Sequence, residues 1–231
     1  MVGAARNPAL ALVLGLVSGV AGVAFAVSLF LGGWGVATPP TETLGDFQGS
    51  TGSGGFHPYW ILPVVTVLIF AILLVPRFSL LGEELGRGRP VLARTAAYLS
   101  ATGAVLVALG FLLSYAVLAS LASVPAPPGT SPAYAAAIWA SGLASLEGFG
   151  LILLAVGLLT FGGLAWNSHV LPRWLAIVGF VGGVAGLFGF VPTWGTDISL
   201  VVPVVLIVWC LAVAGILGRT TRGAGSPQTA G

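Results

Sequence analysis

Six long apolar stretches occupy most of this 231-residue chain. They cover residues 9–32, 59–76, 91–121, 133–165, 171–191 and 197–218. About 20 apolar residues in a helix cross a hydrocarbon layer of about 30 Å, and a helix satisfies its own backbone hydrogen bonds in lipid. The sequence therefore predicts an all-α polytopic membrane bundle of six transmembrane helices. We expect one domain over residues 1–218 and a disordered cytoplasmic tail over residues 219–231.

The composition excludes an ordinary soluble globule. Hydrophobic residues make up 57% of the chain and charged residues 6%, and the mean hydropathy is +1.07. Soluble domains carry roughly 25% charged residues, which they need to cover a water-exposed surface. The net charge of +2 comes from scattered arginines and does not form the basic patch that nucleic acid requires. We therefore expect the lipid bilayer as partner, and no nucleic acid.

All eight basic residues are arginines, and each falls in a segment that six spans place on one side of the membrane. They are Arg6, Arg77, Arg87, Arg89, Arg94, Arg173, Arg219 and Arg222. Positive charge near span ends stays on the cytoplasmic side. The pattern predicts a multi-pass protein of the inner (plasma) membrane with both termini in the cytoplasm. A cleaved signal peptide is the alternative for residues 9–32, but that apolar stretch is too long for one.

The connections fit this orientation. Residues 37–58 are rich in glycine and serine and predict a flexible external loop. Residues 77–87 predict a short amphipathic helix on the cytoplasmic surface, with its arginines near anionic head groups. Five tryptophans fall near span ends, where amphipathic rings anchor a helix. They are Trp34, Trp60, Trp166, Trp174 and Trp194.

Small residues spaced four apart predict where helices pack closely in lipid. The candidates are Gly15, Gly19, Gly22, Gly179, Gly183 and Gly186; contact within a homo-oligomer is the alternative to packing within one bundle. Residues 15–22 and 179–186 also have similar sequences, and each precedes a span that carries Pro-Val-Val. The first and last hairpins are therefore candidates for a parallel repeat. Chance similarity between glycine- and valine-rich segments is the alternative.

Glu147 is the acid that the sequence places deepest in a span, near the middle of residues 133–165 and about 20 Å from the outer end. A carboxyl at that depth costs several kcal/mol unless it is protonated or finds a partner. Hydroxyls precede it on its own span at Ser141 and Ser145. Others stand on the third span at Tyr98, Ser100 and Thr102. The candidate proton- or substrate-binding residues are Glu147, Ser145, Ser141, Tyr98 and Thr102. A neutral clamp between helices is the alternative role for Glu147.

No enzyme or cofactor site follows from the remaining residues. Cys210 is the one cysteine, and His57 and His169 fall in loops on opposite sides of the membrane. We therefore expect no metal, no haem and no other cofactor. The Glu83-Glu84 pair with Arg87 is similar to the signature of CAAX-type intramembrane proteases, but the spacing differs and no histidine lies in a span. Catalysis is the least favoured of three roles, after a structural or accessory protein and a small proton-coupled transporter.

Residues 159–175, LTFGGLAWNSHVLPRWL, continue into the glycine-rich fifth stretch. This segment, with its Ser-x-x-Leu-Pro-Arg-Trp-Leu turn, resembles a family of six-span bacterial membrane proteins of unknown function. The resemblance implies six spans, with the turn on the cytoplasmic side between spans four and five. It brings no catalytic residues. A homo-oligomer and an unidentified membrane partner both remain open.

Overall fold

The computed structural model describes residues 8–31, 61–86, 88–123, 144–168, 171–188 and 201–223. Six helices account for nearly all of them, and no strand occurs in these ranges. The helices are α1 (Pro8–Leu31), α3 (Ile61–Leu85), α4 (Pro90–Ser123), α6 (Ala144–Asn167), α7 (Arg173–Phe188) and α9 (Val201–Gly223). The all-α helical bundle expected from the sequence is confirmed.

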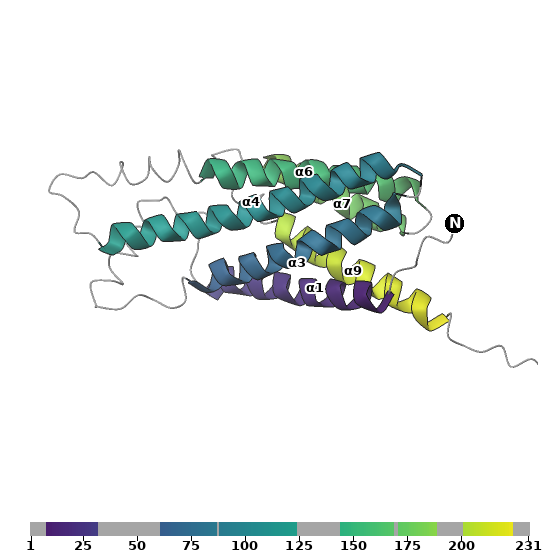
Figure 1. The fold of residues 1–231 in the computed structure, drawn as a ribbon, viewed down its shortest axis with the longest axis horizontal. Helices are drawn as coiled ribbons and strands as arrows, with labels where there is room; N and C mark the ends of the chain where they lie inside the picture. Colours follow the sequence, from purple (N-terminus) through teal and green to yellow (C-terminus); the bar gives the residue numbers. More distant parts are fainter. Residues whose placement is uncertain are drawn as a thin grey trace, which may run out of the picture.

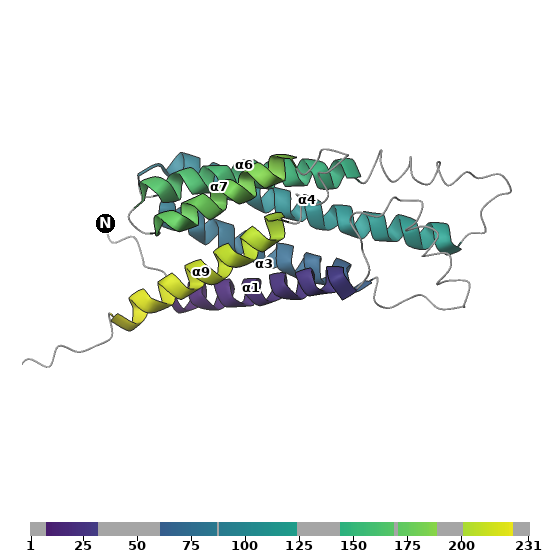
Figure 2. The ribbon, with the colours of Figure 1, turned by 180° about the vertical axis from the view of Figure 1, so that it is seen from behind.

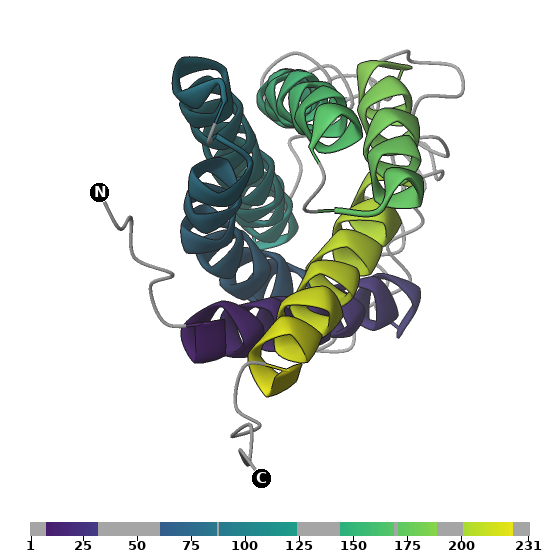
Figure 3. The same ribbon diagram turned by 90° about the vertical axis from the view of Figure 1, so that its right-hand side faces the viewer.

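The helices lie side by side along one axis (Figures 1 and 2), and their contacts form a closed ring. Each helix packs on the one that follows it in the sequence, and α9 returns to pack on α1. The α1–α9 contacts run from Gly15 at Ala214 to Gly22 at Ile207, so these two helices are antiparallel. Figure 3, which views the bundle from its end, shows the six helices arranged around a common centre. We call the end that carries the 86–89 and 168–172 connections the turn end.

Three helices contain apolar segments long enough to cross a membrane: Ile61–Leu85, Pro90–Leu113 and Leu146–Asn167. The chain is therefore a membrane-embedded protein. The apolar segments of the other three helices are shorter, at Leu12–Ser28, Arg173–Phe188 and Val201–Ile216. Segment length in the described residues thus identifies three spans and does not by itself support the six that the sequence predicts.

The outer surface of the ring is apolar on every helix. Exposed side chains include Val20 on α1, Ile72 on α3, Val91 on α4, Phe149 on α6, Val181 on α7 and Val204 on α9. An apolar belt of this extent is costly in water and costs nothing in lipid. All six helices therefore present a lipid-compatible face, including the three with shorter apolar segments.

The tightest packing joins α4 to α6, backbone against backbone. A Cβ on Gly150 would lie 2.8 Å from the Val107 nitrogen and 2.9 Å from the Gly103 oxygen. A Cβ on Gly103 would in turn lie 2.6 Å from the Gly150 oxygen. Such an approach requires glycine on both helices, because any side chain would separate the backbones. Dispersion and close packing therefore hold this pair together.

The glycines singled out in the sequence lie at helix contacts. Gly15, Gly19 and Gly22 face Ala214, Leu211 and Ile207 of α9. On α7, Gly179 faces Trp209 of α9, whereas Gly183 and Gly186 face Leu159 and Ala155 of α6. α7 thus uses two glycine faces to fit between α6 and α9.

The two similar hairpins do not share a register. The Ser18 hydroxyl on α1 lies 3.5 Å from the Leu73 oxygen on α3. When the two Pro-Val-Val motifs are aligned, the equivalent pair in the last hairpin is Gly182 with Val213. Gly182 instead faces Val205, about two helical turns away. The sequence similarity is therefore not accompanied by a repeated packing arrangement.

α3 continues past Pro76, where we expected the second span to end. Pro76 removes one N–H from the helical ladder, but neighbouring helices let membrane helices tolerate that loss. The stretch beyond it packs inward through Phe78, Leu81 and Leu85. The surface helix predicted for residues 77–87 is therefore wrong. The connection to α4 is a short turn, in which the Arg89 nitrogen donates to the Gly86 oxygen at 3.1 Å.

Replacement of Gly150 by alanine should weaken the α4–α6 pair. The added methyl would meet the α4 backbone, and overpacking of this kind costs about 1–3 kcal/mol. Thermal unfolding in detergent should therefore shift to a lower temperature. Gly163→Ala on the same helix is the matched control, because no atom lies within 4 Å of the position a Cβ would take. Equal unfolding temperatures for Gly150→Ala and Gly163→Ala would contradict the close contact.

Candidate functional site

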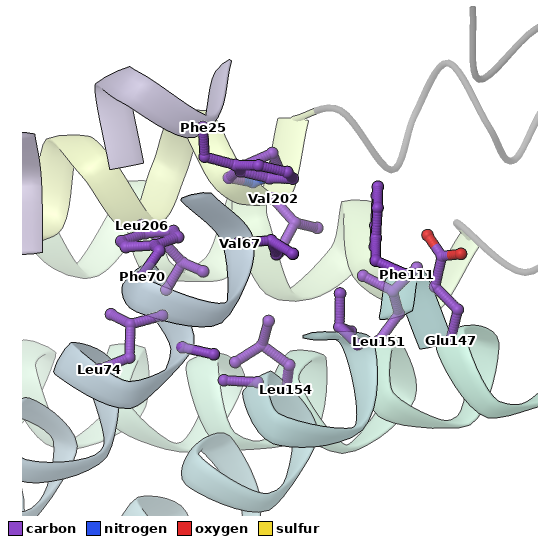
Figure 4. A pocket seen from close by; sticks show the side chains of 14 residues that line it. Phe25, Val67, Phe70, Leu74, Phe111, Glu147, Leu151, Leu154, Val202 and Leu206 are labelled. Atoms are coloured by element: carbon purple, nitrogen blue, oxygen red, sulfur yellow. The ribbon is translucent and has the colours of Figure 1, made fainter. Parts of the chain in front are cut away.

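A cavity of about 60 Å³ lies in the centre of the ring. Apart from one glutamate, apolar side chains of α1, α3, α4, α6 and α9 surround it (Figure 4). The lining residues are Phe25, Val67, Phe70, Ala71, Leu74, Ala104, Val107, Phe111, Glu147, Leu151, Leu154, Val202, Pro203 and Leu206. A space of this size can hold a few water molecules or a compact solute, and it is far below the several hundred Å³ typical for drug-sized ligands.

Three phenylalanines from three helices make the aromatic wall of the cavity. Phe25 of α1 meets Phe111 of α4 edge to face, with 5.6 Å between ring centroids. Phe25 also lies 6.5 Å from Phe70 of α3 in a tilted arrangement. Beside this wall, the Ser28 and Thr66 hydroxyls are 2.9 Å apart and link α1 to α3. The sequence did not single out these residues, since apolar spans show no periodicity that separates inner from outer faces.

Glu147 supplies the titratable side chain among the described residues that line the cavity. It belongs to the first turn of α6 and is half-buried. Figure 4 shows its carboxylate beside the Phe111 ring at one side of the cavity. Within the described ranges, no hydrogen bond or ion pair joins this carboxylate to another side chain. The carboxylate therefore lines the cavity without a side-chain partner among the described residues.

Glu147 lies far from the turn end of the bundle. Its backbone packs against Gly110, where a Cβ would lie 3.0 Å from the Glu147 Cβ. Gly110 is about 30 Å along α4 from Pro90. A hydrocarbon layer of about 30 Å that starts at the turn end would therefore reach its far edge near Glu147. The sequence placed Glu147 near the middle of its span; the structure puts it towards the far side.

The structure does not bring the expected hydroxyls of α4 to Glu147. Tyr98 is 71% exposed on the outer surface, and Thr102 is exposed as well. Along α4 they lie about 18 Å and 12 Å from Gly110, the residue that faces Glu147. Ser141 lies outside the described residues. Ser145 belongs to α6, but its side chain is also outside the described part.

Arg77, which the sequence predicts in a loop, is a buried charged residue that lies nearer the middle of the bundle than Glu147. Arg77 of α3 is 3% exposed and interacts electrostatically with Glu84 of α3 and with Cys210 of α9. Gly82 faces Ala93 and Ala97 on α4. The same antiparallel register sets Arg77 level with Ser100, about 15 Å along α4 from Pro90. Among the described residues, the charged side chain nearest the middle of the bundle is therefore Arg77.

An aromatic group packs at the same depth as Arg77. Phe78 and Phe161 stack with 5.9 Å between centroids, and Phe161 lies 6.3 Å from Trp209. The Trp209 indole donates a 2.9 Å hydrogen bond to the Leu175 oxygen of α7. Four helices thus meet here, and together they close the space between the cavity and the turn end.

The tryptophans expected at span ends are only partly described. Trp166 and Trp174 are about half exposed near the turn end, and Arg173 lies over the Trp166 ring at 5.9 Å. Trp34, Trp60 and Trp194 lie outside the described residues, as do His57 and His169. Among the described residues, no three histidine, cysteine, aspartate or glutamate side chains come together as metal ligands.

Replacement of Trp209 by phenylalanine should destabilise the turn half of the bundle. The ring would be retained and the hydrogen bond to Leu175 lost, at a cost of about 0.5–1.5 kcal/mol. Thermal unfolding should shift down by a few degrees. Trp166→Phe at the exposed surface is the control and should unfold like the native protein. An unchanged unfolding temperature for Trp209→Phe would show that the buried bond contributes nothing.

Comparison with known proteins gives one match. The sequence model of a family described as "Domain of unknown function (DUF4386)" matches residues 9–219. Neither the curated proteins nor the solved structures contain a match to the chain. The expected resemblance to an uncharacterised family is confirmed at that level, and the family description assigns no activity.

Proposed function

We propose that this chain, which belongs to the DUF4386 family, is a small proton-coupled transporter in which Glu147 is the proton-binding group. One observation carries the proposal. Glu147 is the titratable side chain of an otherwise apolar central cavity, and within the described residues no other side chain pairs with it. A carboxyl in an apolar cavity without a hydrogen-bonding partner is costly, and proteins retain such ionisable residues in membrane bundles mainly for proton or substrate handling.

The cavity favours this role over a clamp between helices. A clamp needs a hydrogen-bonding partner for Glu147 on a facing helix. Among the described side chains none supplies one, and the residue of α4 that faces Glu147 is Gly110. Figure 4 shows the Phe111 ring beside the carboxylate, and a phenylalanine ring has no polar group that could pair with it. The cavity beside the carboxylate instead has room for water, which can exchange a proton with the carboxylate, or for a compact solute. A compact solute therefore fits the proposed transporter better than a bulky one.

Six spans with both termini in the cytoplasm complete the proposal. Six helices of alternating direction return the chain to its starting side, and α1 begins at the same end of the bundle as α9 finishes (Figure 1). The outer faces of all six helices are apolar. Arg89, Arg94 and Arg173 gather at the turn end, which favours that end as the cytoplasmic side. The proposal places the protein in the inner (plasma) membrane.

Replacement of Glu147 by glutamine should remove one titrating carboxyl from the membrane-embedded protein. Infrared difference spectra of the protein in lipid, recorded as pH changes, should show a protonated-carboxyl band that Glu147→Gln lacks. In proteoliposomes with a pH-sensitive dye inside, solute-driven proton movement should fall to the level of empty vesicles. The fold should survive, because glutamine keeps the shape of the side chain.

Glu83→Gln is the matched control for this experiment. Glu83 is an exposed glutamate at the end of α3, so its loss should change neither the band nor the proton movement. If Glu147→Gln and the native protein gave the same infrared titration, the proposal would fail. Unchanged stability and unchanged phenotype would then favour a structural or accessory role.

Labelling of single cysteines tests the six-span arrangement. In a Cys210→Ala background, we expect Gly54→Cys, Gly129→Cys and Gly195→Cys to react with an impermeant maleimide in intact cells. Gly88→Cys and Ser168→Cys should react only after the membrane is opened. Any break in this alternation would remove a span from the proposed topology, and a reversed pattern would place both termini outside.

A further inference from the structure

The lining of the central cavity combines a carboxylate with an aromatic wall. Phe25, Phe70 and Phe111 form the wall, and Glu147 lies beside the Phe111 ring (Figure 4). Because Phe25 and Phe111 meet edge to face at 82°, their contact covers only one of their ring faces. Such faces carry negative partial charge and attract a cation within about 6 Å of the ring centroid. The carboxylate and the rings therefore both favour a positively charged ligand.

Other classes of solute fit this lining less well. No described lining residue is positively charged, so Glu147 would repel an anion without compensation. A polar neutral solute needs several hydrogen-bonding partners once it leaves water. The Ser28 and Thr66 hydroxyls beside the wall already lie within hydrogen-bonding distance of each other and of the Phe25 and Leu62 carbonyls. A calcium ion takes about six to eight oxygen ligands, far more than a single carboxylate provides.

A small organic cation matches each part of the lining. Its N–H groups can donate to the Glu147 carboxylate, and its charge is attracted to the ring faces. Its alkyl part can pack on aliphatic side chains such as Leu151 and Val202. The cavity of about 60 Å³ has room for an ion of a few heavy atoms and excludes a bulky one.

We infer that the solute of the cavity is a small organic cation of the alkylammonium class, held between the Glu147 carboxylate and the wall of Phe25, Phe70 and Phe111. The inference rests on the proposed function and names its solute. Proton and cation compete for one carboxylate. When the ammonium ion pairs with Glu147, the carboxyl releases its proton to water, so one positive charge replaces another. Exchange is therefore one for one.

The other described titratable groups lie nearer the turn end than the cavity. Arg77 lies about one turn beyond Leu74, which lines the cavity, and about 15 Å separates the levels of Arg77 and Glu147. The described part of α1 contributes no charged residue. The remaining groups on the surrounding helices and turns are Glu83, Glu84, Arg89, Arg94, Tyr98, Arg173 and Cys210. A pH dependence of binding that disappears in Glu147→Gln would therefore report this carboxyl.

Methylammonium binding tests the inference. The full chain is used in detergent, because the neutral form of methylammonium crosses bilayers. Calorimetric titrations should show one site, whose affinity falls by up to about tenfold per pH unit as lower pH protonates Glu147. In weakly buffered solution, a pH dye should report up to one proton released per protein. Methanol, an uncharged molecule of similar size, should bind far more weakly, and sodium chloride at equal concentration should release no proton.

Replacement of Phe111 by leucine tests the aromatic wall. Leucine keeps an apolar side chain and removes the ring, so the affinity for methylammonium should fall about tenfold. The infrared band of Glu147 should remain. Phe149→Leu on α6 is the matched control, because Phe149 is 56% exposed on the outer surface, and it should bind like the native protein. Phe25→Leu provides the same test if Phe111→Leu does not fold.

The outcomes separate the inference from the proposed function. Absence of methylammonium binding, binding that does not change with pH, or equal binding by Glu147→Gln would overturn the inference. Equal affinities in Phe111→Leu and Phe149→Leu would overturn the role of the aromatic wall. In each case the proposed function would stand with a different solute, provided that Glu147 titrates. A missing Glu147 titration would instead overturn the proposed function.

Discussion

The close approach of α4 and α6 determines where the site forms. Gly103 and Gly150 let the two backbones touch, and this contact fixes the rotation of both helices about their axes. Gly110 and Glu147 lie a short distance further along the same contact, so the carboxyl is presented beside Phe111 and at the edge of the cavity. Without an apolar driving force between helices in lipid, such small-residue contacts are the main source of specificity.

The ring closes because glycines recur at a second contact, between α1 and α9. Both contacts draw their helix pairs together, whereas bulky aromatic side chains fill the centre. Phe25, Phe70 and Phe111 hold the helices apart at one level, and the Phe78, Phe161 and Trp209 group fills the next. The cavity is the space left between these two aromatic layers. The position of the cavity follows from two features. Glycines at the helix contacts bring helices together, and large aromatic side chains in the centre keep them apart.

Composition and span pattern were sufficient to predict the helical membrane bundle, since few other structures satisfy such an apolar chain. They could not locate the site correctly. Pro76 suggested the end of a span, which assigned Arg77 to a loop; inter-helix packing, invisible in one sequence, carries α3 through the proline. Tyr98 and Thr102 stand on the outer face of α4. In spans that are apolar all round, no periodicity distinguishes that face from the inner one.

The burial of Arg77 also constrains how the protein is made. The thiol of Cys210 that neighbours this arginine belongs to α9, which leaves the ribosome after the other described helices. Until α9 arrives, the ring is open at that side and the guanidinium is incompletely enclosed, which makes a deep position of α3 expensive. α3 therefore reaches its final depth only after α9 has been made. A chain truncated before α9 would expose a charged helix to lipid and present the features that membrane quality control recognises.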